Sequence, residues 1–119
     1  MPVEVRQEGR RLLVGVIRGV LRKSELDAFQ KAAADLIRRE MTISCLIVLD
    51  GFKGWERGAD WGDLTFMERH DEALEKLAIV GPSEHQDDVV MFTAAPLRAG
   101  RVRYFSSASE ARAWLGAHQ

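Results

Sequence analysis

Residues 3–18 show a pattern of apolar and polar positions that is typical of a β-hairpin. Val alternates with charged residues over 3–7, and the run 11–18 is rich in Leu, Val and Ile. Gly9 lies in the short polar stretch between the two runs, where a tight turn is needed. The sequence therefore predicts two strands, at 3–7 and 11–18, with Gly19 closing the second.

The next segment has the periodicity of an amphipathic helix. Ser24 is a typical N-cap residue, and acidic residues follow in the first turn, where the helix dipole favours them. The helix is predicted to run to about Glu40. Its apolar residues share one face that we expect to lie in the core: Leu26, Phe29, Ala33, Leu36 and Ile37.

Strands and helices alternate along the rest of the chain. Apolar runs predict strands at 44–50, 76–81 and 101–105, and helices are predicted at 59–70, 83–94 and after Ser107. The last of these helices follows a capping box that runs from Ser107 to Glu110. Strands that alternate with helices imply parallel pairing through right-handed crossovers, and the opening hairpin adds one antiparallel edge strand. The predicted fold class is α/β, a single mixed five-stranded sheet in one domain over residues 1–119.

Composition and charge narrow the function without naming it. The chain of 119 residues carries 17 basic and 18 acidic residues, a balance that argues against a dedicated nucleic-acid binder. The longest apolar run, 45–49, is too short to span a bilayer, and the first residues lack the layout of a secretory signal. One cysteine, Cys45, permits no internal disulfide and suits a reducing compartment. We therefore expect a cytoplasmic protein.

Glycines and aromatic rings gather directly after the strand predicted at 44–50. The segment 50–62 holds four of the ten glycines, and four of the nine aromatic residues lie between Phe52 and Phe66. In open α/β sheets ligands collect beyond the carboxyl ends of the strands, which is where this glycine-rich loop is expected. Two interpretations stay open: a compact loop that folds its own rings onto the sheet edge, or a site for an apolar ligand or partner.

Under the second interpretation the rings converge on one apolar cleft beside the helix predicted at 59–70. The predicted ligand-binding residues are Phe52, Trp55, Trp61, Phe66, Val89 and Phe92. The glycine-rich loop would form the mobile lip of this cleft, with charged residues at its rim that can hold a polar head group. The predicted rim residues are Lys53, Glu56 and Arg57.

Other candidate chemistry is sparse. Asp50, at the end of a strand, suits either a base or metal ligand or, more commonly, an acceptor for backbone amides of the turn. The three histidines lack zinc-site spacing, and the glycines lack either nucleotide-binding fingerprint, so no metal site and no cofactor is predicted. Cys45 is expected to be buried and inert. No catalytic residue is predicted; an enzyme that uses Asp50 and His70 is the weakest hypothesis.

The segment from Leu49 to Trp55, followed by the segment 59–64, resembles the SpoIIAA-like family of small bacterial proteins. The later runs 77–81, 102–105 and 110–115 are similar to the remaining landmarks of that family. The family is related to the sulfate-transporter and anti-sigma-factor-antagonist (STAS) domain and has been likened to the Sec14 lipid-binding fold. The resemblance implies the sheet order 1-2-3-4-5, with the first strand antiparallel, and a cavity near the second and third helices.

The resemblance also frames the function. It implies a non-enzymatic module that binds a small apolar or lipid-like ligand, with peripheral contact to membranes. The alternative is a protein-interaction module like the anti-sigma-factor antagonists. Those antagonists place a phosphoacceptor serine shortly after the strand that ends at Asp50, but this chain has no serine between Ser44 and Ser83. An exposed aromatic face would also make a homodimer plausible.

Overall fold

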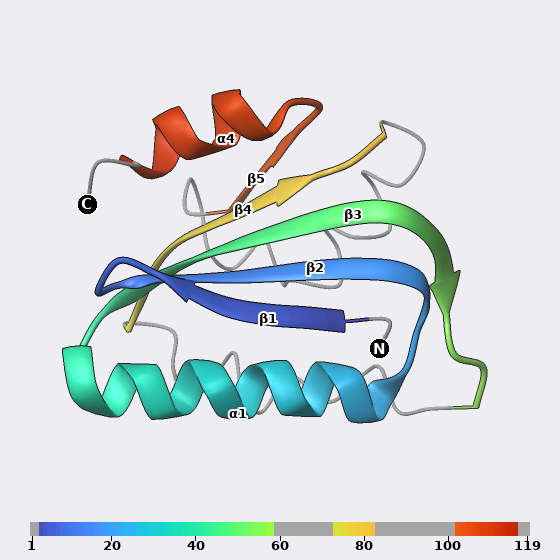
Figure 1. The fold of residues 1–119 in the computed structure, drawn as a ribbon, viewed down its shortest axis with the longest axis horizontal. Helices are drawn as coiled ribbons and strands as arrows, with labels where there is room; N and C mark the ends of the chain where they lie inside the picture. The colour runs from blue at the N-terminus through green and yellow to red at the C-terminus, as the bar shows by residue number, and fades with distance from the viewer. Residues whose placement is uncertain (1–2, 59–72, 83–101, 117–119) are drawn as a thin grey trace.

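The computed structural model describes residues 3–58, 73–82 and 102–116, and Figure 1 shows their arrangement around one sheet. Five strands and two helices lie within these ranges. In chain order they are β1 (Val3–Glu8), β2 (Leu12–Leu21), α1 (Lys23–Glu40), β3 (Ile43–Trp55), β4 (Leu74–Val80), β5 (Val102–Phe105) and α4 (Ala108–Leu115). The helices predicted at 59–70 and 83–94 lie outside the described residues.

The strands form one mixed sheet in the order β1-β2-β3-β4-β5. β1 pairs antiparallel with β2, and the three following pairs are parallel. The predicted order and the antiparallel first strand are both confirmed. Hydrophobic residues fill β3 without alternation over residues 45–49, as expected for a strand that is covered on both faces.

The two described helices lie on opposite faces of the sheet, as Figure 1 shows with α1 below and α4 above. On the α1 side, one apolar cluster extends from β2 to β5 and includes two fully buried side chains, Leu36 and Ile79. On the α4 side, a second cluster joins β2, β3 and β4 to Ala111 and Leu115 of the helix. The Nζ of Lys76 donates a hydrogen bond of 2.8 Å to the carbonyl oxygen of Trp114 and so ties α4 to β4.

A glycine lets α1 lie close to the sheet. A Cβ atom added at Gly15, in the middle of β2, would lie 2.7 Å from Cε2 of Phe29. Because that separation is shorter than a van der Waals contact, only glycine allows this ring to sit on the strand. Phe29 was predicted on the buried face of the helix, and it packs against the α1-side cluster.

Several element boundaries differ from the sequence-based predictions, and three of the differences bear on the site. β2 continues past Gly19, which has a φ of 66°, and ends at Leu21, because the longer β3 offers it a partner there. β3 likewise runs to Trp55 instead of ending at residue 50. The N-cap of α1 is Arg22, not Ser24, and the Glu25 carboxylate accepts a hydrogen bond of 2.7 Å from its backbone N–H.

Two local predictions are confirmed. Ser107 is the N-cap of α4, and its hydroxyl oxygen accepts a hydrogen bond of 3.5 Å from the backbone N–H of Glu110. Cys45 is buried, with 3% of its surface exposed. Neither α1 nor α4 is both long enough and apolar enough to cross a membrane.

Candidate functional site

The segment that follows Asp50 is a strand, where the sequence predicted a glycine-rich loop. It extends β3 alongside the end of β2, with Phe52 opposite Gly19 and Trp55 opposite Leu21. The register shifts twice here, and Gly51 and Gly54 of this extension have φ values of 68° and 112°. The glycines therefore allow irregular pairing of two strands and do not mark the end of the sheet.

This extension is tied to the start of α1. The backbone N–H of Glu56 donates a hydrogen bond of 2.8 Å to the carbonyl oxygen of Leu21. The Glu56 carboxylate then accepts a hydrogen bond of 3.1 Å from the backbone N–H of Lys23, one of the donors that a helix leaves unpaired in its first turn. Glu56, predicted at the rim of a ligand site, therefore caps a helix.

The structure describes only part of the predicted ligand-binding set. The Phe52 side chain is 8% exposed and belongs to the α1-side core cluster. Lys53 and Arg57 are exposed on the surface. The side chain of Trp55 lies outside the described part, as do the other predicted site residues: Trp61, Phe66, Val89 and Phe92. The predicted convergence of these rings thus stays a prediction.

A small apolar cavity lies between the first turns of α1 and the sheet, next to the β2–β3 extension. Its volume is about 30 Å³, and a cavity needs roughly 10–15 Å³ on this measure to hold one water molecule. Apolar atoms make up nearly all of its wall, and the one ionisable side chain along it is Glu25. The lining residues are Gly15, Ile17, Leu21, Glu25, Leu26, Phe29 and Ile47. This cavity lies beside α1, whereas the sequence predicted a ligand cleft beside the helix at 59–70, which lies outside the described residues.

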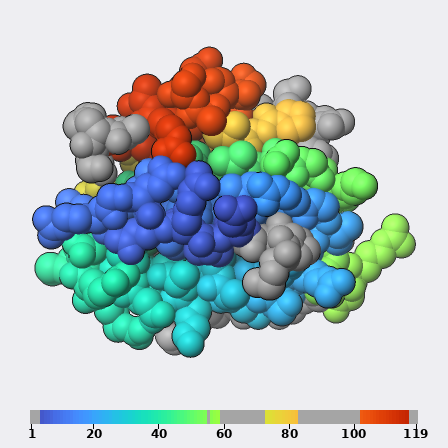
Figure 2. All heavy atoms as spheres, viewed as in Figure 1, coloured from blue at the N-terminus to red at the C-terminus, as the bar shows by residue number. Residues whose placement is uncertain are grey.

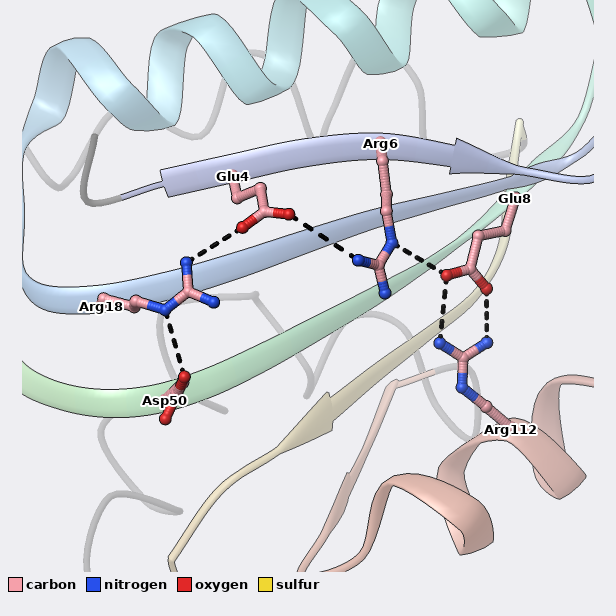
Figure 3. Close-up of polar contacts among 6 residues, drawn as sticks. All are labelled: Glu4, Arg6, Glu8, Arg18, Asp50 and Arg112. Carbon is pink, nitrogen blue, oxygen red and sulfur yellow. Dashed lines mark hydrogen bonds and ion pairs between the residues drawn. The ribbon is translucent and has the colours of Figure 1, made fainter.

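A row of alternating charges covers the opposite face of the sheet over β1, as Figure 3 shows. Glu4, Arg6 and Glu8 occupy successive positions on one side of the strand, and Arg6 lies 3.0 Å from Glu8 and 3.7 Å from Glu4. We call these three side chains the β1 charged row. In the sequence, the same alternation predicted a strand but not this charged surface.

One end of the β1 charged row is fixed to α4. Arg112 makes two hydrogen bonds to the Glu8 carboxylate, at 2.6 and 3.2 Å, across 104 positions of sequence. The bond from Arg112 is the main reason that the pKa of Glu8 is lowered from its ordinary value, and the pKa of Arg112 is raised in turn. Both side chains are about one-third exposed, so solvent partly screens the pair.

The other end of the row contacts β2 and β3. Arg18 donates hydrogen bonds of 3.0 Å to Glu4 and 3.1 Å to Asp50. Asp50, considered above as a base or as an acceptor for turn amides, is therefore paired with a guanidinium and is 64% exposed. Within the described ranges, no three His, Cys, Asp or Glu side chains lie close enough together to hold a metal ion.

Comparison with known proteins agrees with this architecture. The family model described as SpoIIAA-like matches residues 12–116, and the chain therefore belongs to the SpoIIAA-like family. A solved structure from Shewanella loihica PV-4, an uncharacterised DUF3478 protein with a SpoIIAA-like fold, is 21% identical with a TM-score of 0.70. The match covers 95% of this chain and 91% of that one. A search of curated proteins finds no match.

Two further solved structures share the fold at lower identity. The anti-sigma factor antagonist SpoIIAA in its unphosphorylated form is 12% identical with a TM-score of 0.63, over 98% of this chain and 97% of that one. The Bacillus cell fate determinant SpoIIAA in its phosphorylated form is 13% identical with a TM-score of 0.59, over 94% and 97%. At these identities the likeness establishes the fold alone.

Proposed function

We propose that this SpoIIAA-like protein is a non-enzymatic module that binds a small apolar or lipid-like ligand where β2 and β3 end beside α1. The observation that supports it is the apolar cavity between the first turns of α1 and the sheet. Walls made almost wholly of apolar atoms are typical of sites that take hydrocarbon. The Glu25 carboxylate accepts a hydrogen bond from the backbone N–H of Arg22 at the start of α1, and the wall of the cavity stays apolar.

The cavity in this state has room for about one small group, so a longer ligand needs α1 and the sheet to move apart. The N-terminal half of α1 is the part that moves in this proposal. Glu56 holds the start of this helix in place. Its backbone N–H donates a hydrogen bond of 2.8 Å to the carbonyl oxygen of Leu21 at the end of β2, and its carboxylate accepts one of 3.1 Å from the backbone N–H of Lys23. Peripheral membrane contact belongs to the same proposal, since a lipid-like ligand would be taken from a bilayer.

The test is uptake of a fluorescent fatty acid by the purified protein. Leu26→Glu places a carboxylate in the wall of the cavity and is expected to reduce uptake by about tenfold or more, because a buried charge repels hydrocarbon. Ala28→Glu, at an exposed position on the same helix, is the matched control and should leave uptake unchanged. Equal uptake by both variants, at similar thermal stability, would place the ligand elsewhere.

The second candidate is a protein-interaction module, favoured by the solved neighbour that is described as an anti-sigma factor antagonist. Such a module would act without a phosphoacceptor serine at the usual place. Native mass spectrometry before and after organic extraction separates the two candidates. A small molecule that co-purifies favours the ligand, whereas a stoichiometric protein partner without a small molecule favours the interaction module.

A further inference from the structure

β1 is the last strand at one edge of the sheet, and its outer side is unpaired among the described strands. Figure 2 shows its atoms across the front of the molecule, uncovered by the other described elements. The residues from Glu4 to Gln7 are all exposed. An edge of this kind presents free backbone N–H and C=O groups, and these pair readily with another strand.

Many proteins protect such an edge with charged side chains, lysine above all, but a row that alternates in sign can meet a second copy with opposite charges. When β1 pairs antiparallel with β1 of a second copy across a two-fold axis, one residue lies at the axis. That residue is opposite the same residue of the second copy, and it defines the centre of the register. Centred on Val5, the pairing places Glu4 opposite Arg6 of the second copy, twice. Centred on Arg6, it places arginine opposite arginine and Glu4 opposite Glu8; centred on Glu4, it places glutamate opposite glutamate. Charge therefore favours the register centred on Val5.

A register centred on Gln7 also matches opposite charges, Arg6 with Glu8. It pairs only the last residues of the strand, however, because the turn that follows Glu8 lies within it. The Val5 register pairs residues 3–7 in full. It also brings the two Val5 side chains, each 37% exposed, against one another on the α1 face.

The row is held in place before any partner arrives. Arg112 fixes Glu8, and Arg18 fixes Glu4. Within one strand, Arg6 lies 3.0 Å from Glu8 and 3.7 Å from Glu4, and each of these positions is two residues and about 6.7 Å away along the strand. Directly opposed residues of neighbouring strands have Cβ atoms about 5 Å apart, so each arginine meets the glutamate of the second copy more closely. Side chains that are already ordered lose less entropy on association.

We propose that the outer edge of β1 pairs antiparallel with β1 of a second copy of this chain, centred on Val5, and extends the sheet across a two-fold axis. Both α1 helices then lie on one face of the extended sheet and both α4 helices on the other. Strands of this length make a small contact, so the dimer forms in a concentration-dependent way. This inference is independent of the proposed ligand.

Sedimentation equilibrium of the intact protein at increasing concentration tests the proposal. Glu4→Arg sets arginine opposite arginine twice, and Arg6→Glu sets glutamate opposite glutamate twice. Each variant alone should bind a second copy of itself at least about tenfold more weakly than the wild type does. An equimolar mixture of the two restores opposite charges at both positions, and heterodimers are expected to form at about the wild-type affinity.

Two control variants carry the same changes of charge away from the edge. Arg11→Glu lies in the turn after β1, and Glu75→Arg lies on the exposed surface of β4. Both are expected to associate as the wild type does, and circular dichroism checks that every variant is folded. The proposal is overturned if the wild type is monomeric up to about 1 mM. It is also overturned if the single variants associate as tightly as the wild type, or if their mixture associates no more tightly than either variant alone.

Discussion

The two faces of the sheet are covered in different ways. On one face the 18 residues of α1 contact β1, β2 and β3, and the apolar cluster beneath the helix continues to β5. On the other face the eight residues of α4 contact β3, β4 and β5, and the β1 charged row lies on the same face at the far edge of the sheet. Among the described residues, apolar side chains lie under the two helices, and alternating charges lie on the edge strand β1.

The strongest test of this difference is to truncate one buried leucine side chain in each helix to alanine. Leu36 of α1 and Leu115 of α4 are both 1% exposed. Leu36→Ala is expected to lower the free energy of unfolding by about 4 kcal/mol, because its neighbours in the middle of a long helix cannot close the cavity. Leu115→Ala is expected to cost about 2.5 kcal/mol, since it is the last residue of a short helix that can shift.

Urea unfolding followed by circular dichroism measures both losses. Met at each position is the control, because it keeps most of the volume and should cost less than about 1.5 kcal/mol. Equal losses for the two alanine variants would contradict the comparison and would mean that α4 is held as rigidly as α1.

A smaller effect is expected where α1 touches the sheet. Gly15→Ala places a methyl group 2.7 Å from the Phe29 ring and is expected to cost about 2 kcal/mol. Phe29→Leu shortens the side chain at that contact, so adding Gly15→Ala to it should cost much less than in the wild type. Urea unfolding of the two single variants and the double variant gives the coupling free energy between Gly15→Ala and Phe29→Leu. Additive losses would show that the ring does not lie on Gly15.

The sheet was predictable because its signals are local. Apolar runs such as 45–49 and the turn at Gly9 identify strands without knowledge of their neighbours. The family resemblance supplied their order. The predicted face of α1 was correct for the same reason: Ala33 and Leu36 recur at helical spacing and are buried.

The extension of β3 was not predictable from local signals. Glycines such as Gly51 and Gly54 ordinarily mark loops, and only the pairing with β2 converts this stretch into a strand. The cap that Glu56 gives α1 joins residues 33 positions apart, and Arg112 meets Glu8 across 104. Contacts of this kind depend on the assembled sheet. For the candidate site, the sequence predicted a cleft beside the helix at 59–70, whereas the cavity beside α1 depends on the packing of Phe29 on Gly15, which no local signal indicates.

The charged face gives the next prediction, and it depends on pH. Because the folded-state pKa of Glu8 is lowered, the ionised carboxylate stabilises the fold above its ordinary pKa, and this contribution disappears as the pH falls through the lowered value. Glu8→Gln should cost about 1 kcal/mol at pH 7, because the pair with Arg112 is bidentate but partly exposed. The difference between variant and wild type should shrink below about pH 4.3. Urea unfolding at pH 7 and pH 3 checks it; a difference at pH 3 as large as the difference at pH 7 would contradict an ionic origin.

The smallest effect is expected at the other end of the same row. Arg18 contacts Glu4 and Asp50 at 3.0 and 3.1 Å, but all three side chains are about half exposed or more, and water and salt screen such pairs strongly. Arg18→Gln is therefore expected to leave the melting temperature unchanged at about 0.15 M salt and to lower it slightly at about 0.01 M, where the screening length is about 30 Å. Arg18→Lys, which keeps the charge, is the control and should match the wild type at both. A loss at 0.15 M as large as that of Glu8→Gln would show that geometry within the row, and not exposure, sets the strength of its ion pairs.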